Sequence, residues 1–242
     1  MHKSKGFRKF LSRLKNFQED IEVLDVFCKN ISSFSTSDNI FDGVTKKHPN
    51  LVKRKNSQHD RILVSTHLKH TLYVSLIKEI YEELMIYLGY VLTCGALSAP
   101  DPVNLVGNEQ KINMSANDIL SLKNIEDVVA KIMQDIFRKI ENKRDTLLLV
   151  RELNNRLGLD IEDEIIEKAM PYLQARHKFV HADGLVDDDY KKKYTNMKLT
   201  KDGCIKLNRK IMNSAFFAIK NLAEAFENSM SMRHYFPKDE YQ

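Results

Sequence analysis

The stretch "LKHTLYVSLIKEIYEELMIYL", residues 68–88, decides the fold class through its apolar pattern. Leucine or isoleucine recurs at every fourth position, at Leu68, Leu72, Leu76, Ile80, Leu84 and Leu88. Residues four apart lie on one face of an α-helix, so this spacing builds an apolar ridge. The charged residues mostly lie off that ridge: Lys69, Lys78, Glu79, Glu82 and Glu83. We therefore expect one long amphipathic helix from about residue 61 to 94.

A second apolar series lies nearer the N-terminus, at alternating spacings of three and four. Its members are Phe7, Phe10, Leu14, Phe17, Ile21, Leu24, Cys28 and Ile31. This is a heptad seam, which suits either a bundle helix packed on its own chain or a coiled-coil contact between two chains. The stretch 32–50 that follows is rich in Ser, Asp, Asn, Gly and Pro and predicts a loop.

Further helices are expected at about 117–143, 145–157 and 208–232, each with apolar residues at helical spacing. Gly158 can take the left-handed position that ends the second of these. The stretch 98–110 is rich in Pro, Gly and Asn and should break the chain between helices.

One more helix begins near Asp160, where several acids favour a helix N-terminus. Pro171 must kink or divide this helix, and Gly184 is placed to end it. The polar stretch "DDDYKKKY", 187–194, is expected to be a loop, and "MKLTKDGCIKLN", 197–208, a small hairpin around Asp202-Gly203.

The composition agrees with long helices, since 242 residues contain only 8 Gly and 5 Pro. The fold class expected is an all-α helical bundle with at most one small β-hairpin. We expect three parts: a basic amphipathic helix with its loop at 1–60, a helical domain at 61–232 and a tail at 233–242.

Charge and cysteine content limit the setting of the protein. The net charge is +5, with basic clusters in "MHKSKGFRKFLSRLK" and at 53–55, which suit a polyanion partner or a solvated helix end. Three widely spaced cysteines and a charged N-terminus without a signal-peptide core favour the cytoplasm. The apolar run 84–99 has 16 residues, fewer than the roughly 20 of a membrane span, so it is expected to be buried core.

The stretch "ARHKFVHADG", 175–184, gathers residues that carry chemistry. His177 and His181 are four apart and could hold a metal with Asp183 or one of the acids at 187–189, but the glutamate of a zinc-protease HExxH pattern is missing and Lys178 takes its place. The residues could also be cations favoured at a helix C-terminus.

A third interpretation is catalytic. An arginine can hold a phosphate and stabilise charge that develops on it, and a histidine can transfer protons near neutral pH. With RNA as the substrate, the attacking group would be its own 2′-hydroxyl and no metal would be required. Arg176 and His181 are five apart, about 140° on a helix, so they would flank a groove. A two-fold dimer would bring two such pairs into one cleft.

Arg176-His177-Lys178-Phe179-Val180-His181 resembles the RxxxxH motif of HEPN domains. The resemblance covers approximately 61–232 and implies an all-α, homodimeric, metal-independent endoribonuclease without a cofactor. It makes Arg176 and His181 the catalytic pair, with His177 as the polar residue that positions them. Lys178 and Asp183 are expected to contact the substrate, although Asp183 can instead cap the helix end.

The resemblance implies a toxin or phage-defence effector with RNA as substrate, an antitoxin or regulatory protein as a further partner, and no membrane. The alternative is a non-catalytic dimeric HEPN module that binds RNA, nucleotide or a protein partner. In that case Arg176 and His181 would hold a phosphate without turnover.

Overall fold

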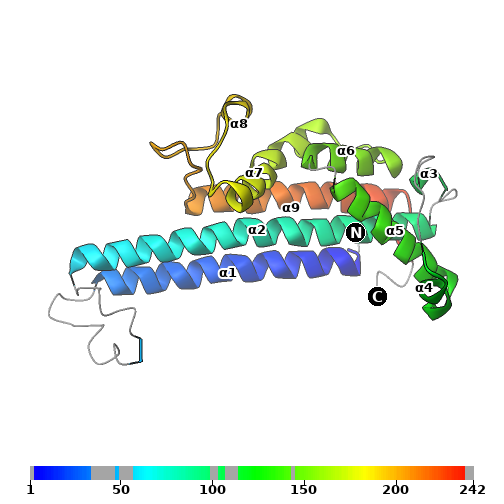
Figure 1. Cartoon of the computed structure of the whole chain (residues 1–242), viewed down its shortest axis with the longest axis horizontal. Coiled ribbons are helices and arrows are strands. Elements are labelled where there is room, and N and C mark those ends of the chain that lie inside the picture. Colours follow the sequence, from blue (N-terminus) through cyan, green and yellow to red (C-terminus); the bar gives the residue numbers. More distant parts are fainter. Residues whose placement is uncertain are drawn as a thin grey trace.

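The computed structural model describes residues 3–33, 47–48, 57–98, 103–106, 114–142 and 145–237. The loops expected at 32–50 and 98–110 and the basic cluster at 53–55 lie largely outside these ranges. The described part is helical and contains no β-strand, which confirms the all-α prediction (Figure 1). Its helices are α1 (Lys5–Ser33), α2 (Gln58–Ser98), α3 (Val103–Val106), α4 (Ala116–Ser121), α5 (Ile125–Glu141), α6 (Thr146–Arg156), α7 (Asp163–His181), α8 (Asp188–Lys193) and α9 (Arg209–Met232).

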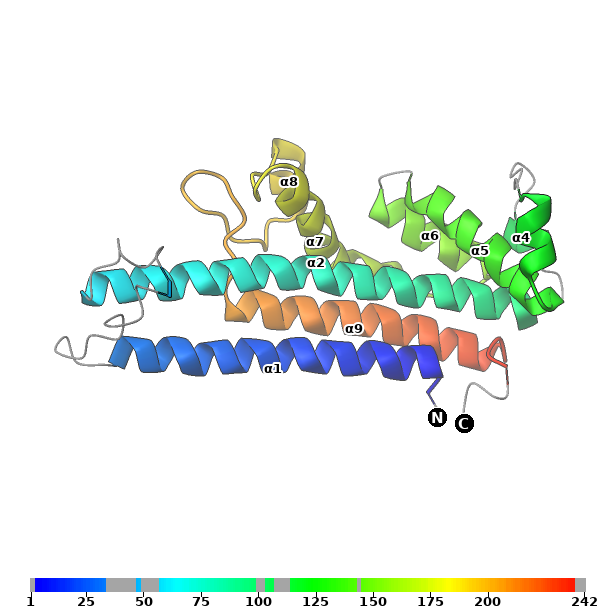
Figure 2. The same cartoon turned by 60° about the horizontal axis from the view of Figure 1, so that its bottom comes forward.

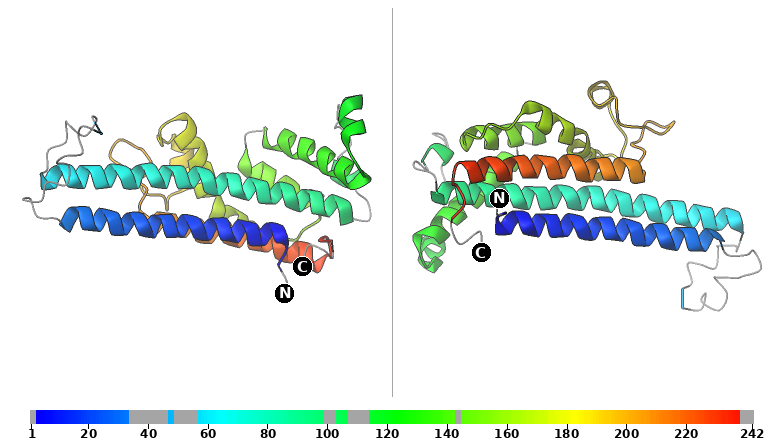
Figure 3. Two further views of the ribbon diagram at one scale, coloured as in Figure 1. Left: turned by 90° about the horizontal axis from the view of Figure 1, so that it is seen from below. Right: turned by 180° about the vertical axis from the view of Figure 1, so that it is seen from behind.

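The long helices α1, α2 and α9 lie side by side, and α1 and α2 run antiparallel (Figure 2). Helix α5 packs on α2, α7 packs on both α2 and α9, and α6 packs on α7 and α5, while α8 projects from the body beside the end of α7 (Figure 3). The ends of α1 and α2 that meet the 34–56 connection extend beyond α9 in every view. Helix α2 is thus the central element of the bundle, in contact with α1, α5, α7 and α9.

The apolar seam of α1 packs inside its own chain, so the bundle interpretation is confirmed. Most of its members are buried against α2 and α9: Phe7, Phe10, Leu14, Ile21 and Cys28. A buried polar contact fastens the start of α1, where Ser4 Oγ donates to Glu227 of α9 at 2.8 Å and Tyr87 of α2 donates to the same carboxylate at 2.9 Å. Because this buried carboxylate accepts several hydrogen bonds, it avoids the cost of an unpaired charge.

Helix α2 is longer than expected at both ends, and its apolar ridge is buried from Leu76 to Leu88. Leu68, at the protruding end, is 42% exposed. By length and composition α2 could cross a membrane, but 61% of its most apolar window is buried inside the bundle. Packing against four helices therefore accounts for its hydropathy, as expected for the run 84–99.

Two local predictions were wrong. The region 117–143 is two helices, because Asn124 begins α5 as an N-cap whose side chain accepts the Asp127 N–H at 2.8 Å. The stretch 187–194 contains helix α8, in which Asp187 accepts the Tyr190 N–H at 2.9 Å. Acids in the first turn and lysines in the last turn of α8 complement the helix dipole, which explains a helix in so polar a segment.

Helix α7 passes through Pro171 without a break and ends where predicted. Tyr190 of α8 donates to the Pro171 carbonyl oxygen at 2.8 Å. The N–H groups of Ala182 and Gly184 both donate to the Lys178 carbonyl, and Gly184 takes the left-handed φ of 84°. Gly158 ends α6 in the same way, at a φ of 59°. The predicted hairpin is a turn closed by an isolated bridge between Leu199 and Ile205.

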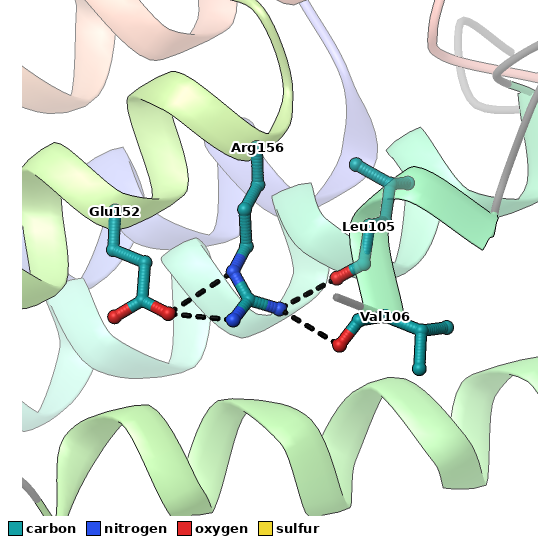
Figure 4. Close-up of polar contacts among 4 residues, drawn as sticks. All are labelled: Leu105, Val106, Glu152 and Arg156. Carbon is teal, nitrogen blue, oxygen red and sulfur yellow. Dashed lines mark hydrogen bonds and ion pairs between the residues drawn. The ribbon is translucent and has the colours of Figure 1, made fainter. Parts of the chain in front are cut away.

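Arg156, near the end of α6, joins that helix to the short helix α3 (Figure 4). Its Nη1 donates to the carbonyl oxygens of Leu105 and Val106 at 2.7 and 3.2 Å. Its Nε and Nη2 donate to one carboxylate oxygen of Glu152 at 3.1 and 2.6 Å. The guanidinium therefore satisfies otherwise unpaired carbonyls of α3 while its own charge is neutralised.

Candidate functional site at the end of α7

A cavity of about 550 Å³ lies where α7 meets α2, α5 and α6. This volume is within the about 300–1,000 Å³ range of ligand pockets. The polar residues around it include Arg176, His177 and His181 from α7, Tyr81 from α2, Glu141 from α5 and Thr146 from α6. The three residues that define the RxxxxH motif therefore border a single cavity.

Arg176 reaches from α7 across to α2. Its Nη2 donates to Glu82 Oε1 at 2.8 Å, and the guanidinium carbon lies 4.7 Å from the centre of the Tyr81 ring. The Nε atom is buried and has no hydrogen-bond partner within the described part of the chain. A buried N–H without a partner is costly, so this arginine has hydrogen-bonding capacity that the fold leaves unused.

The two histidines of the motif lie on the same face of α7, one turn apart. Their ring centres are 4.6 Å apart, with an angle of 50° between the ring planes. Both residues are exposed to solvent at the cavity's edge. A proton carrier at the edge of the cavity that Arg176 also borders can exchange protons with water.

Lys178 and Asp183 do not border the cavity. Lys178 pairs with Asp187 and lies over the Tyr190 ring, 6.0 Å from its centre, on the side of α7 that carries α8. The hydrogen bond from Lys178 lowers the pKa of the Asp187 carboxyl. Asp183 is exposed and takes a φ of 48° just after the last turn of α7. These two residues therefore fasten α8 and shape the helix end, away from the candidate site.

Tyr81, Glu82 and Glu141 were not anticipated from the sequence. Burial raises the pKa of the Glu141 carboxyl and the charge of Glu82 raises it further, while Arg176 opposes both effects. Burial also raises the pKa of the Tyr81 hydroxyl, which hydrogen-bonds to Thr146. The only sequence signal was that Glu82 lies off the apolar ridge of α2, which does not specify its contact with Arg176, 94 positions away.

The metal interpretation needs a third ligand beside the two histidines. No group of three His, Cys, Asp or Glu side chains suited to a metal occurs among the residues that the structure places. Asp187, one of the acids considered for this role, instead binds Lys178 and caps α8. The charged and titratable groups at the described site thus include Arg176, the two histidines, Tyr81 and Glu141, with Glu82 paired to Arg176.

Such a site can hold an oxyanion on the guanidinium and transfer protons through an imidazole. No protein-family model matches the chain, and no curated protein or solved structure matches it. A functional proposal therefore depends on the motif and on the contacts of these side chains.

Proposed function

We propose that the chain is a metal-independent endoribonuclease of HEPN type. The observation that carries this proposal is the cavity that Arg176, His177 and His181 line together. The position of Arg176 at this cavity supports an oxyanion as ligand, because a phosphate can accept from two guanidinium nitrogens at once. The exposed histidines support a role in proton transfer.

In the proposed reaction, the 2′-oxygen of a ribose attacks the adjacent phosphorus as the 2′-hydroxyl loses its proton to a base. Arg176 stabilises the charge on the phosphorane oxygens. The bond from phosphorus to the 5′-oxygen then breaks, and that oxygen takes a proton. His181 acts as general acid or base and His177, 4.6 Å away, positions it. The products are a 2′,3′-cyclic phosphate and a 5′-hydroxyl.

The one-sided arrangement of the catalytic groups supports a homodimer as the working form. Both histidines come from one helix and are exposed, so a single chain supplies imidazoles to only one side of a bound phosphodiester. A two-fold axis beside the end of α7 would supply a second set. We propose a cytoplasmic toxin or phage-defence effector, with an antitoxin or regulatory protein as a further partner.

A non-catalytic binding module is the second candidate, and the Glu82 contact favours it. Glu82 holds Arg176 at 2.8 Å, so part of the arginine's charge is already neutralised before a ligand arrives. Such an arginine could bind a phosphate by exchange with Glu82 and yet contribute too little to a transition state for turnover.

The test is incubation of purified protein with a mixed RNA pool in EDTA. Wild type should cleave and leave cyclic phosphate ends, whereas Arg176→Ala and His181→Ala should lose activity by about 10²–10⁴-fold. Arg233→Ala and His70→Ala are matched controls, since Arg233 pairs with Asp160 at 2.9 Å and His70 is exposed on α2, both outside the cavity.

Equal behaviour of wild type and both motif variants would contradict catalysis by this site. Binding of RNA by wild type, without cleavage and with loss in Arg176→Ala, would support the binding module. Cleavage that EDTA abolishes would contradict the metal-independent mechanism and support a metal bound by His177 and His181.

A further inference from the structure

A second hollow adjoins the candidate site, between α2 and α5. It is a groove of about 510 Å³ whose apolar walls include Met85, Ile86, Tyr90 and Phe137. Glu141 borders both the groove and the cavity. The Arg176–Glu82 ion pair also joins a residue of the cavity to a residue of the groove. The groove therefore lies next to the cavity that Arg176 borders.

Gly89, in the C-terminal third of α2, leaves one part of the groove without a side chain. A Cβ placed there would meet the Phe137 ring at 3.7 Å, which is ordinary van der Waals contact. Gly6 and Gly95 differ, because a Cβ would lie only 2.4 Å from the Tyr90 ring and 2.3 Å from Leu157.

Packing therefore explains Gly6 and Gly95 but does not require Gly89. Its φ is not in the left-handed region either. A glycine inside a helix lowers stability relative to alanine. A residue that the fold does not need, and that keeps a groove open, is expected where a ligand approaches the backbone closely.

We propose that this groove binds the base of a nucleotide that flanks the phosphate held at Arg176. The inference rests on the proposed function, since it extends the RNA site by one base. Of the two aromatic residues that line the groove, Tyr90 is partly exposed and can stack on a planar base, whereas Phe137 is only 8% exposed. Thr93, Gln134 and Arg138 line the same groove and supply hydrogen-bonding groups for the edge of a base. The groove thus combines aromatic side chains with polar groups.

The experiment compares the binding of nucleotides with that of a ligand that lacks a base. Adenosine 3′-monophosphate, adenosine 5′-monophosphate and ribose 5-phosphate are titrated by calorimetry into the full chain. Wild type should bind at least one of the nucleotides about tenfold more tightly than ribose 5-phosphate. Gly89→Leu, which fills the groove, should remove that difference and leave the affinity for ribose 5-phosphate unchanged.

Two further variants make the result specific. Ser75→Leu adds the same side chain at an exposed position of α2 outside the groove, and should bind like wild type. Ile86→Glu places a charge on a groove residue that is 59% exposed, so it should lose the nucleotide preference even if Gly89→Leu does not fold.

The inference is overturned if wild type shows no preference for nucleotides, or binds none of the three ligands. It is also overturned if Gly89→Leu keeps the preference for nucleotides. A smaller oligomer mass for Gly89→Leu than for wild type would overturn it too, because a second copy of the chain would then cover the groove in wild type. Cleavage of RNA without a preference for nucleotides over ribose 5-phosphate refutes only the binding of a base in the groove. A preference for nucleotides without cleavage of RNA refutes the proposed endoribonuclease activity but not the binding of a base in the groove.

Discussion

Arg156 and Arg176 each contact one glutamate, yet their surroundings differ completely. The guanidinium of Arg156 donates to Glu152, Leu105 and Val106 through all three nitrogens (Figure 4). That of Arg176 donates through Nη2 to Glu82, keeps a buried Nε without a partner in the described structure, and borders a cavity. The first arginine completes the fold, whereas the second has unused capacity next to space for a ligand.

The difference shows how to tell a structural arginine from a functional one when each is partly buried. Arg156 meets its partner one turn away on α6, so the pair is formed as soon as the helix forms. Arg176 meets Glu82 only when α7 packs on α2, and Glu82 is 50% exposed and free to turn into solvent. A contact of this kind can be exchanged for a ligand at low cost.

The largest expected difference between the two arginines is in RNA cleavage. Arg176→Lys keeps the charge but loses the planar pair of donors, so cleavage should fall by about 10²-fold. Arg156→Lys should leave the rate unchanged, because Arg156 does not border the cavity. Initial rates at saturating RNA measure both. Equal losses in the two variants would show that Arg176 also acts through the fold.

For stability, in contrast to cleavage, the Arg156 variant should show the larger loss. Arg156→Ala should lower the free energy of unfolding by about 1–3 kcal/mol, because Glu152 and the α3 carbonyls lose their donors. Arg176→Ala should change it by less than about 0.5 kcal/mol, since removing the partnerless Nε offsets the lost Glu82 contact. Urea denaturation of both variants checks this. A loss at Arg176 as large as that at Arg156 would remove the distinction.

Much of the fold could be predicted because a period of 3.6 residues is visible in the sequence. The ridge of α2, the seam of α1 and the end of α7 at Gly184 depend on local spacing and on backbone preferences. The break at Asn124 and helix α8 were missed, although both have a side-chain N-cap. Capping by Asn or Asp competes with an equally common use of these residues in loops, and the apolar pattern does not resolve it.

The candidate site could be predicted only in part, for a similar reason. Arg176, His177 and His181 lie on one helix, so the motif alone places them close together. Lys178 belongs to the same motif but lies on the face that α8 covers, and the fold of α8 decides its contacts. Tyr81, Glu82 and Glu141 join the site through the packing of α2, α5 and α7, which no local pattern in the sequence describes.

The smallest expected effect concerns Glu141, which borders the same cavity as Arg176. Burial and the charge of Glu82 raise its pKa above the ordinary 4.5. A raised carboxyl pKa favours folding below the ordinary value, and this contribution is lost as the pH rises through the folded pKa. Wild type should therefore lose stability relative to Glu141→Gln between pH 4 and pH 7. Because Glu141 is partly exposed, the change should stay below about 1 kcal/mol.

Urea denaturation of wild type and Glu141→Gln at the two pH values measures this effect together with its coupling to Glu82, since titrating groups that do not interact with Glu141 contribute equally to both proteins. The same pair in an Arg176→Ala background sharpens the comparison. Arg176 lowers the pKa of Glu141, so its removal should enlarge the pH-dependent difference. An identical difference with and without Arg176 would mean that the guanidinium does not affect the pKa of Glu141. The charge of Arg176 would then interact with Glu82 alone.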